Sequence, residues 1–285
     1  METKGGGLMV YVDGTQADLI PLLNSFPRGS MERDILKDME ESREAFRFRT
    51  EDELKFELTF RANTVNSARS LNGSGMDFST FKDSRCNTAY WERKENGGFL
   101  LRGGVSPASA IRDIFQNGRK YATECATAMV IVFYGALVRS YGDALFNSTF
   151  PRIYLMNWIR LDPLLKDIGI PHKTPKLLLG DRGYFSNPDF DPETPEWQGE
   201  NVIVLPNALY YGHGIGITTA DNIIAALNEN RKEGATQTAY QQDSAARPDF
   251  SELYRRYAAA ASVQTAASLV WPAFPAERRR VFAMR

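Results

Sequence analysis

The chain is poor in the residues that bind metals and form disulfides. Its 285 residues contain only two cysteines, Cys86 and Cys125, and two histidines, His172 and His213. The cysteines do not form a Cys-x-x-Cys motif, and so few ligands do not favour a zinc site of Cys and His. Two cysteines are also too few for a disulfide scaffold. We therefore expect chemistry that needs no metal and no cofactor.

Net charge and long apolar runs are lacking as well. The formal net charge is -1, which gives no whole-chain signal for nucleic acid or an anionic membrane surface. The longest apolar stretch, residues 126–138, is shorter than the roughly 20 residues that a membrane-spanning helix needs. The N-terminus lacks the basic stretch and apolar core of a secretory signal. We expect synthesis in the cytoplasm, without nucleic-acid or membrane partners.

The composition itself is that of a globular chain. Hydrophobic residues make up 43% and charged residues 24% of the sequence, which is enough apolar material for a sizeable core. We expect a single domain over residues 1–257. Residues 258–285 are rich in alanine and arginine and contain two prolines, a composition that favours a C-terminal tail over further core.

Cys125 opens a long apolar segment whose pattern is typical of a buried helix. The run is Thr123-Glu124-Cys125-Ala126-Thr127-Ala128-Met129-Val130-Ile131-Val132. The positive end of a helix dipole favours a thiolate and lowers the pKa of a cysteine, so Cys125 is a candidate nucleophile. The alternative is a small apolar side chain on a core helix, because free cysteine is often simply buried.

Two helices are predicted before Cys125. Apolar spacing predicts a helix over residues 51–68. A second helix is expected between Ser106-Pro107, a capping hydroxyl followed by proline, and the stop signal Asn117-Gly118. A short strand is predicted over residues 8–12. Helical and strand patterns are thus mixed along the first half of the chain.

Strands dominate the pattern after Cys125. Residues 199–205 and 209–217 predict the two strands of a hairpin, with a turn at Pro206-Asn207. Residues 219–234 then predict a helix that ends at Gly234.

Two further residues are candidates to act on the thiol. Glu200 leads an apolar strand and shares a face with Val202 and Val204. Desolvation on such a face raises the pKa of a carboxyl group, as a general acid or base near neutral pH requires. The alternative is a strand-edge glutamate that reaches water. His213 either orients the thiol, as histidine does in papain-like enzymes, or belongs to a hairpin loop.

Several separated blocks of sequence resemble the spore-coat transglutaminases of endospore-forming bacteria. The resemblance covers about residues 52–257. It departs from the family pattern in the N-terminal part, in residues 161–176 with His172, and after Tyr257. The blocks are Asn87-Thr88-Ala89-Tyr90-Trp91, Pro107-Ala108-Ser109-Ala110-Ile111-Arg112-Asp113-Ile114, Glu124-Cys125-Ala126-Thr127-Ala128, Asn187-Pro188-Asp189-Phe190-Asp191-Pro192 and Trp197-Gln198-Gly199-Glu200-Asn201-Val202-Ile203.

This resemblance implies a compact α+β fold with a papain-like core, in which the cysteine at a helix N-terminus packs on an antiparallel sheet. It implies a calcium-independent protein-glutamine gamma-glutamyltransferase whose Cys125 forms a thioester with glutamine and passes the acyl group to lysine. Glu200 and Glu124 match the catalytic carboxylates of the family, and His213 matches a histidine near the site. The implied partners are glutamine- and lysine-bearing proteins of the spore coat, which is also the expected location.

Electrostatics constrains how these residues act together. A thiolate beside a carboxylate is a like-charge pair, so the two groups are expected to share one proton. Glu124 and Cys125 are about 100° apart around a helix and do not face each other, which makes Glu200 the better-aimed partner. The aromatic residues Trp91, Tyr184, Trp197 and Tyr211 either line an apolar channel at the thiol or belong to the core.

Two other functions fit the same residues. A papain-like cysteine hydrolase would keep Cys125 and its partners but deliver water to the thioester. A non-enzymatic coat scaffold would keep the fold with an idle thiol, and rapid selective alkylation of Cys125 would argue against it.

Overall fold

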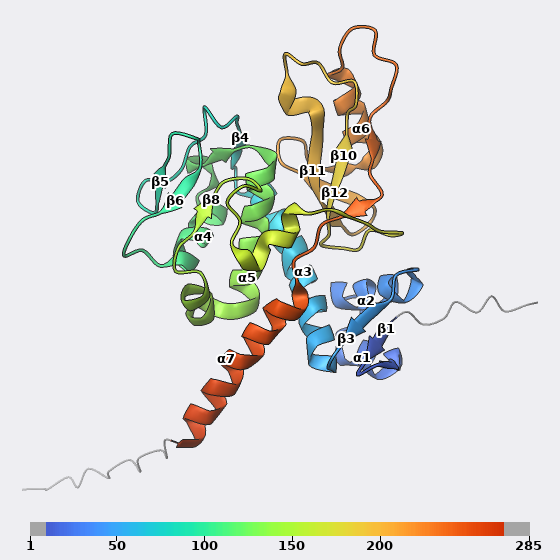
Figure 1. Cartoon of the computed structure of the whole chain (residues 1–285), viewed down its shortest axis with the longest axis vertical. Coiled ribbons are helices and arrows are strands. Elements are labelled where there is room, and N and C mark those ends of the chain that lie inside the picture. The colour runs from blue at the N-terminus through green and yellow to red at the C-terminus, as the bar shows by residue number, and fades with distance from the viewer. Residues whose placement is uncertain (1–9, 271–285) are drawn as a thin grey trace, which may run out of the picture.

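The computed structural model describes residues 10–270, with side chains described up to residue 262. The predictions for residues 8–9 and 271–285 lie outside the described residues. The largest sheet of the described chain has five antiparallel strands in the order β13-β12-β11-β10-β14 and lies at the upper right in Figure 1. Its strands are β10 (Arg182–Ser186), β11 (Gly199–Leu205), β12 (Leu209–Gly212), β13 (Gly216–Thr219) and β14 (Tyr240–Gln241).

Helices cover both faces of this sheet. Helices α3 (Glu51–Gly73) and α5 (Cys125–Thr149) pack against each other and share the main core with Ile203 and Leu205 of β11. Side chains alternate along a strand, so Val202 faces the other way and packs with helix α6 (Ala220–Glu229) in a second cluster. The long strand β11 is therefore buried on both faces.

Helix α5 is the central helix of the domain. It is long and apolar enough to span a membrane by length and composition, but 78% of its apolar window is buried inside the protein. Helix α4 (Pro107–Gln116) packs along it, and Gly142 interrupts it with a φ of 72°. The length and apolarity of α5 are explained by its place in the core.

A small N-terminal unit packs against α3. Its strands form a sheet in the order β2-β1-β3, and a network of ion pairs connects Glu44 of this unit with Asp181, next to β10. Arg247 contacts Glu44 at 2.9 Å and Asp181 at 2.8 Å, and Arg61 contacts Asp181 at 2.7 Å. The elements are β1 (Val10–Val12), β2 (Thr15–Gln16), α1 (Leu19–Ser25), α2 (Met31–Glu41) and β3 (Phe46–Phe48).

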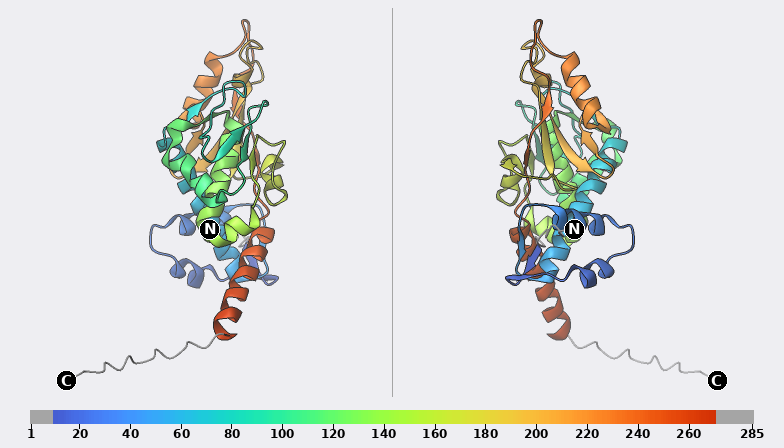
Figure 2. Two further views of the ribbon diagram at one scale, coloured as in Figure 1. Left: turned by 90° about the vertical axis from the view of Figure 1, so that its left-hand side faces the viewer. Right: turned by 90° about the vertical axis from the view of Figure 1, so that its right-hand side faces the viewer.

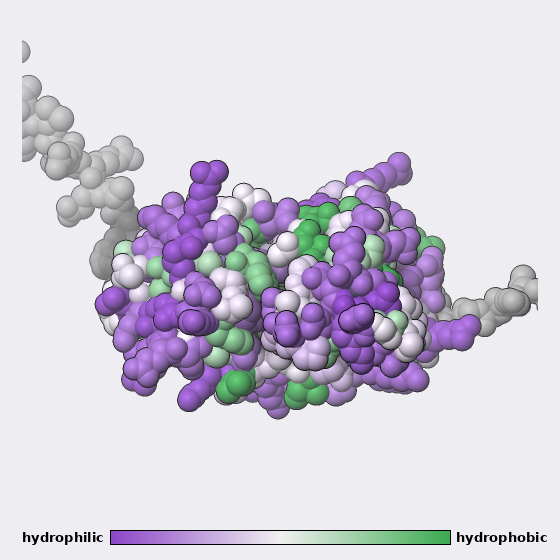
Figure 3. Space-filling view, turned by 90° about the horizontal axis from the view of Figure 1, so that it is seen from above, coloured by the Kyte–Doolittle hydropathy of each residue, from purple (hydrophilic) through white to green (hydrophobic). Residues whose placement is uncertain are grey.

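Helix α7 and several short elements complete the described chain. Helix α7 (Phe250–Val270) leaves the body at the end that carries the N-terminal unit (Figure 2). Seen from above, the surface is mostly hydrophilic, with small separate apolar areas (Figure 3). The remaining elements are β4 (Asp77–Phe78), β5 (Trp91–Arg93), β6 (Phe99–Leu101), η1 (Gly118–Lys120), β7 (Ala122–Thr123), β8 (Tyr154–Leu155), η2 (Pro163–Gly169), β9 (His172–Lys173), η3 (Pro195–Gln198) and β15 (Ser244–Ala245).

The predicted helix starts are confirmed. Ser106 caps α4 by accepting a hydrogen bond from the backbone N–H of Ser109, and Pro107 is its first residue. Thr50 caps α3 in the same way, although α3 continues five residues beyond the predicted end at residue 68 and stops at Gly73. The mixed α and β composition of the fold is also as predicted.

Two predicted elements have different bounds. The predicted strand over residues 209–217 is wrong, because it divides into β12 and β13, which form a second hairpin. The predicted end of α6 at Gly234 is also wrong. The helix ends at Glu229, because Asn230 closes it by backbone and side-chain hydrogen bonds and the chain then pairs with residues 189–191.

Candidate active site

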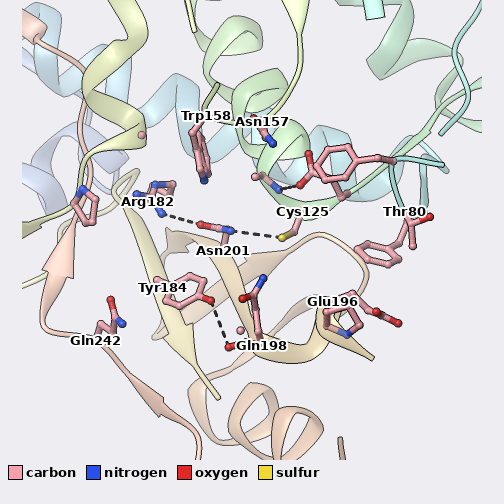
Figure 4. Close-up of a pocket in the computed structure, with 18 residues that line it drawn as sticks. Thr80, Cys125, Asn157, Trp158, Arg182, Tyr184, Glu196, Gln198, Asn201 and Gln242 are labelled. Atoms are coloured by element: carbon pink, nitrogen blue, oxygen red, sulfur yellow. Dashed lines mark hydrogen bonds between the residues drawn. The ribbon is translucent and has the colours of Figure 1, made fainter. Parts of the chain in front are cut away.

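Cys125 is the first residue of α5 and lies at a cavity of about 660 Å³ (Figure 4). The preceding strand β7 pairs with β4 and fixes the entry of the chain into the helix. The cavity is lined by Phe78, Thr80, Phe81, Glu124, Cys125, Ala126, Asn157, Trp158, Gly169, Pro171, Arg182, Tyr184, Pro195, Glu196, Gln198, Gly199, Asn201 and Gln242.

Glu124 caps the helix that begins at Cys125. Its carboxylate accepts hydrogen bonds from the backbone N–H groups of Ala126 and Thr127 and from the hydroxyl of Thr127. These bonds hold the side chain over the helix end, in agreement with the expectation that it does not face its neighbour Cys125. Burial raises the pKa of Glu124, and the hydrogen bonds from Thr127 and Ala126 oppose that shift.

Asn201 is the side chain that contacts the thiol from the sheet. Its Nδ2 donates to Cys125 Sγ at 3.5 Å, and its Oδ1 accepts from Nη1 of Arg182 at 2.7 Å. The Arg182 guanidinium lies 4.7 Å from the centre of the Trp158 ring. The sequence analysis did not identify Asn201, Arg182 or Trp158 as site residues. For Asn201 a signal existed, because side chains alternate along a strand and Asn201 therefore points to the face of Ile203, opposite to that of Glu200.

Glu200 lies on the central strand β11 and is 6% exposed. The alternative of a strand-edge glutamate in water is therefore wrong. Its Oε1 has no hydrogen-bond partner among the described residues, and its carbons and Oε1 pack over Gly212. Burial raises the pKa of Glu200 well above its usual value, and a hydrogen bond from the backbone N–H of His213 opposes that shift. Glu200 is thus a buried, protonatable carboxyl group beside the cavity, on the strand whose neighbouring residues Gly199 and Asn201 line it.

The thiol of Cys125 does not have the lowered pKa expected at a helix N-terminus. Burial, together with the charges of Glu200 and Glu124, raises this pKa to about 12, against hydrogen bonds from Asn201. Desolvation of the half-buried thiol and the charges of two carboxyl groups outweigh the helix dipole. Because the pKa values of both Cys125 and Glu200 are raised, the pair keeps at least one proton at neutral pH.

His213 is close to the site but is engaged elsewhere. It is 4% exposed and follows the end of β12. Its Nε2 lies 3.1 Å from the carbonyl oxygen of Asp77, which can only accept, and its Nδ1 lies 3.1 Å from the hydroxyl of Tyr211. Both ring nitrogens therefore have partners other than Cys125. Burial also lowers the pKa of His213, which favours the neutral ring. The geometry is that of a residue in the hairpin connection.

The aromatic candidates divide between the cavity and the core. Tyr184 lines the cavity, whereas Trp91 and Tyr211 are fully buried core residues. Trp197 packs beside the second hydrophobic cluster. Phe78, Phe81 and Trp158 also line the cavity. They lie far from Cys125 in the sequence and share no sequence pattern with it.

The site contains no recognisable metal centre. Within the described part of the chain, no group of three or more His, Cys, Asp or Glu residues is arranged to hold a metal ion. His172 is exposed on β9. The stretch of residues 161–176 nevertheless contributes to the site, because Gly169 and Pro171 line the cavity.

A cavity that leads to one thiol, flanked by an amide donor and buried carboxyl groups, is typical of a cysteine enzyme that forms a thioester with its substrate. The sequence model of one family, protein-glutamine gamma-glutamyltransferase, matches residues 9–257. The chain belongs to this family, and it is an acyltransferase. The match starts at residue 9, so it includes the N-terminal part that lies outside the predicted resemblance.

Relatives of known function agree with this assignment. The protein-glutamine gamma-glutamyltransferase of Bacillus cereus (strain G9842) is 42% identical over 245 residues, which are 86% of this chain and 87% of that protein. That of Bacillus mycoides (strain KBAB4) is equally similar over the same shares. A solved structure of the Geobacillus stearothermophilus transglutaminase without C-terminal extension is 46% identical with a TM-score of 0.68, and covers 72% of this chain and 97% of that one.

Proposed function

We propose that Cys125 is the nucleophile of a calcium-independent transglutaminase that forms glutamyl-lysine isopeptide cross-links. The observation that carries this proposal is the contact of Asn201 Nδ2 with the cavity-lining Cys125 Sγ, next to the buried carboxyl group of Glu200. A papain-like core is part of the proposal, supported by a cysteine at the start of a helix that packs on an antiparallel sheet.

The first half of the reaction forms the thioester. In the reactive form of the pair, Cys125 is a thiolate and Glu200 holds the proton. Sγ attacks the carbon of the glutamine carboxamide, and the electron pair of the C=O double bond moves to oxygen. The intermediate collapses as the C–N bond breaks, and the leaving nitrogen takes the proton of Glu200 to depart as ammonia.

The second half transfers the acyl group to an amine. The neutral ε-amine of lysine attacks the thioester carbon, and the Glu200 carboxylate accepts the proton that the nitrogen loses. The C–S bond then breaks, which restores the thiolate and the protonated Glu200. Glu124 assists as a second carboxyl group that can hold the shared proton. Its capping bonds support a positioning role as well.

His213 is not assigned a proton-transfer step in this scheme. The engagement of both its nitrogens by Asp77 and Tyr211 supports a role in holding the β12–β13 connection beside Glu200. We propose that it contributes to activity through the placement of Glu200 and not as a base.

Further parts of the proposal concern domains, substrates and location. We propose one transglutaminase domain over residues 1–257 and a tail over residues 258–285. The end of the family match at residue 257 supports this division, although α7 continues through it. We propose glutamine- and lysine-bearing spore coat proteins as substrates and the spore coat as the location, on the basis of the sequence resemblance.

The test is amine incorporation into a glutamine donor peptide, with a fluorescent primary amine and mass spectrometry of the product. We expect the amine adduct with the wild type, none with Cys125→Ala, and equal yields with EDTA or added calcium. A deamidated peptide without adduct would instead indicate the hydrolase. Slow alkylation of Cys125 together with no product would indicate the scaffold. Inhibition by EDTA that calcium reverses would contradict calcium independence.

A further inference from the structure

Arg182 is a buried cation without a carboxylate partner among the described residues. It is 5% exposed, and it takes part in none of the ion pairs of the described chain. It is also the one Lys, Arg or His among the residues that line the cavity. Because a buried unpaired charge is costly, such a residue calls for an explanation at the site it faces.

Three contacts, with Ile168, Trp158 and Asn201, hold the guanidinium in place. Nε donates to the carbonyl oxygen of Ile168 in η2 at 2.8 Å, and the ring of Trp158 lies 4.7 Å from the guanidinium carbon. In the sheet, Arg182 is opposite Ile203 and Tyr184 is opposite Asn201. This register puts the side chains of Arg182 and Asn201 diagonally next to each other on the face toward α5. With Nε bound to Ile168, Nη1 of the guanidinium points at Asn201, as the dashed line in Figure 4 shows.

The contact with Arg182 determines which way the Asn201 amide points. A guanidinium has donors and no acceptor, so it must face the amide oxygen of Asn201, as the 2.7 Å contact shows. The amide nitrogen then faces Cys125 Sγ at 3.5 Å. A reversed amide would place its NH2 group against the guanidinium and its oxygen against the sulfur. Arg182 therefore excludes the orientation that would repel a thiolate.

We propose that Arg182 is a positioning residue, which fixes Asn201 so that its amide N–H points at Cys125 and which supplies positive charge when the thiolate forms. The inference deepens the proposed function and rests on Cys125 being the nucleophile. During acylation the same N–H can donate to the oxygen that gains charge as Sγ attacks the carboxamide.

The charges around the thiol show why such a residue is needed. Glu124 from the helix cap and Glu200 from β11 both oppose the thiolate, and Tyr184 from β10 has its own pKa raised to about 12 by burial. Glu196 from η3 adds a further carboxylate at the cavity wall. Among the charged residues that line the cavity, Arg182 is the one whose charge favours the thiolate. Burial lowers its own pKa to about 10, so it remains charged at neutral pH, and a negative charge at Cys125 favours its cationic form.

The experiment measures the thiol and the reaction separately. In a Cys86→Ser background, the rate of iodoacetamide alkylation of Cys125 is followed against pH, and kcat/KM is followed for amine incorporation. We expect Arg182→Met to shift the midpoint of alkylation to higher pH and to lower kcat/KM about 10²-fold, the loss typical of one oxyanion donor. Arg182→Lys keeps the charge without the planar contact and should recover part of both.

A matched control and a double mutant complete the test. Arg160 is an exposed arginine over the Tyr154 ring at 5.9 Å, outside the cavity lining, so Arg160→Met should change neither readout. If Arg182 acts through Asn201, adding Arg182→Met to Asn201→Leu should lower kcat/KM little further. A full additional loss would overturn the positioning, and Asn201→Ser replaces Asn201→Leu if the latter does not fold.

A merely structural role has a different signature. A lowered melting temperature of Arg182→Met with the alkylation profile of the parent would overturn the proposal. The alkylation profile needs no glutamine or amine substrate. Failure of the parent enzyme to incorporate amine would therefore refute the proposed function alone, whereas an unshifted profile refutes the inference about Arg182.

Discussion

Gly212 is the most direct structural probe of Glu200. A β-carbon at position 212 would lie 2.7 Å from Oε1 and 2.9 Å from Cγ of Glu200. Gly212 is not in a positive-φ conformation, so alanine is compatible with its backbone. Glu200 is only 6% exposed and its strand is fixed between β10 and β12, so the side chain must shift and not the strand. We therefore predict that Gly212→Ala displaces the carboxyl group of Glu200.

The size of the effect follows from these distances. Carbon contacts are most favourable at roughly 3.5–4.0 Å, so the carboxyl group must move by about 1 Å. A misplacement of that size at a catalytic group costs about 10²-fold in rate, which corresponds to about 2.7 kcal/mol at 1.36 kcal/mol per factor of ten. The added methyl group also overpacks the sheet, which typically costs about 1–3 kcal/mol of stability.

Gly183 provides the matched control. Gly183 on β10 and Gly212 on β12 both lie opposite Val202 of β11, on its two sides. A β-carbon at position 183 would lie 3.4 Å from Val202 Cγ2 and 3.6 Å from Leu177 Cδ1, and no atom of Glu200 is among these nearest contacts. Gly183→Ala should therefore retain most of the activity.

The assay is kcat/KM for amine incorporation by both alanine variants, each checked for native melting. The same substitution is then made in Glu200→Gln. Because the loss arises through the carboxyl group, Gly212→Ala should reduce the activity of Glu200→Gln much less than that of the wild type. Full activity in a well-folded Gly212→Ala variant, or an equal loss in both backgrounds, would refute the reasoning.

The remaining predictions concern the thiols, the carboxyl groups and the C-terminal helix. Cys125→Ala should abolish amine incorporation and Cys86→Ser should retain most of it, because Cys86 is buried, has a pKa raised to about 11, and donates to the Trp91 carbonyl. An inactive but folded Cys86→Ser enzyme would contradict this. Glu124→Gln and Glu200→Gln should each keep part of the wild-type kcat/KM, and Glu200→Gln should lose more of it. The kcat/KM of the double mutant should fall far below the product of the single effects. Glu124→Ala should also lower stability by about 1 kcal/mol through loss of the helix cap. The pKa of Glu200 is raised on folding from 4.5, so the folded state holds its proton longer and stability falls as pH rises above that value; denaturant unfolding of Glu200→Gln should lack this fall, and parallel curves for both proteins would disprove it. A chain ended after residue 262 should keep its activity, because the contacts of Tyr257 with Phe56 and Tyr141 are retained; a folded truncation without turnover would show that later residues complete the site.

The sequence by itself determined the elements whose signals are local. Ser106 followed by Pro107, and Thr50 before an acidic turn, specify helix starts because their hydroxyl groups satisfy free backbone N–H groups nearby. The apolar run after Cys125 is long enough to demand burial, and the structure buries it. The apolar run at residues 202–205 specified a strand. A continuously apolar strand signals burial on both faces, but it does not say what covers each face.

The bounds of later elements depend on contacts that no local pattern contains. The α6 helix stops before Gly234 because Asn230 and the pairing near Asp189 compete for its last turn. Residues 209–217 divide because the chain reverses at Gly214, which has a φ of 105°. For α6 the deciding contact is with residues distant in the sequence. For residues 209–217 it is a turn, which the periodicity of apolar residues does not reveal.

The site shows the same division. Cys125 and Glu200 became candidates because each lies at a recognisable place on a helix or a strand, and Glu124 became one through the family resemblance. The rise in the pKa of Cys125, the partners of His213 and the orientation of Asn201 did not follow. Desolvation depends on everything packed around a group, and the amide of Asn201 is fixed by Arg182, which is 19 residues away along the chain and next to it only across the sheet. Local sequence thus indicated Cys125 as the candidate nucleophile, and only tertiary packing decided its electrostatic environment.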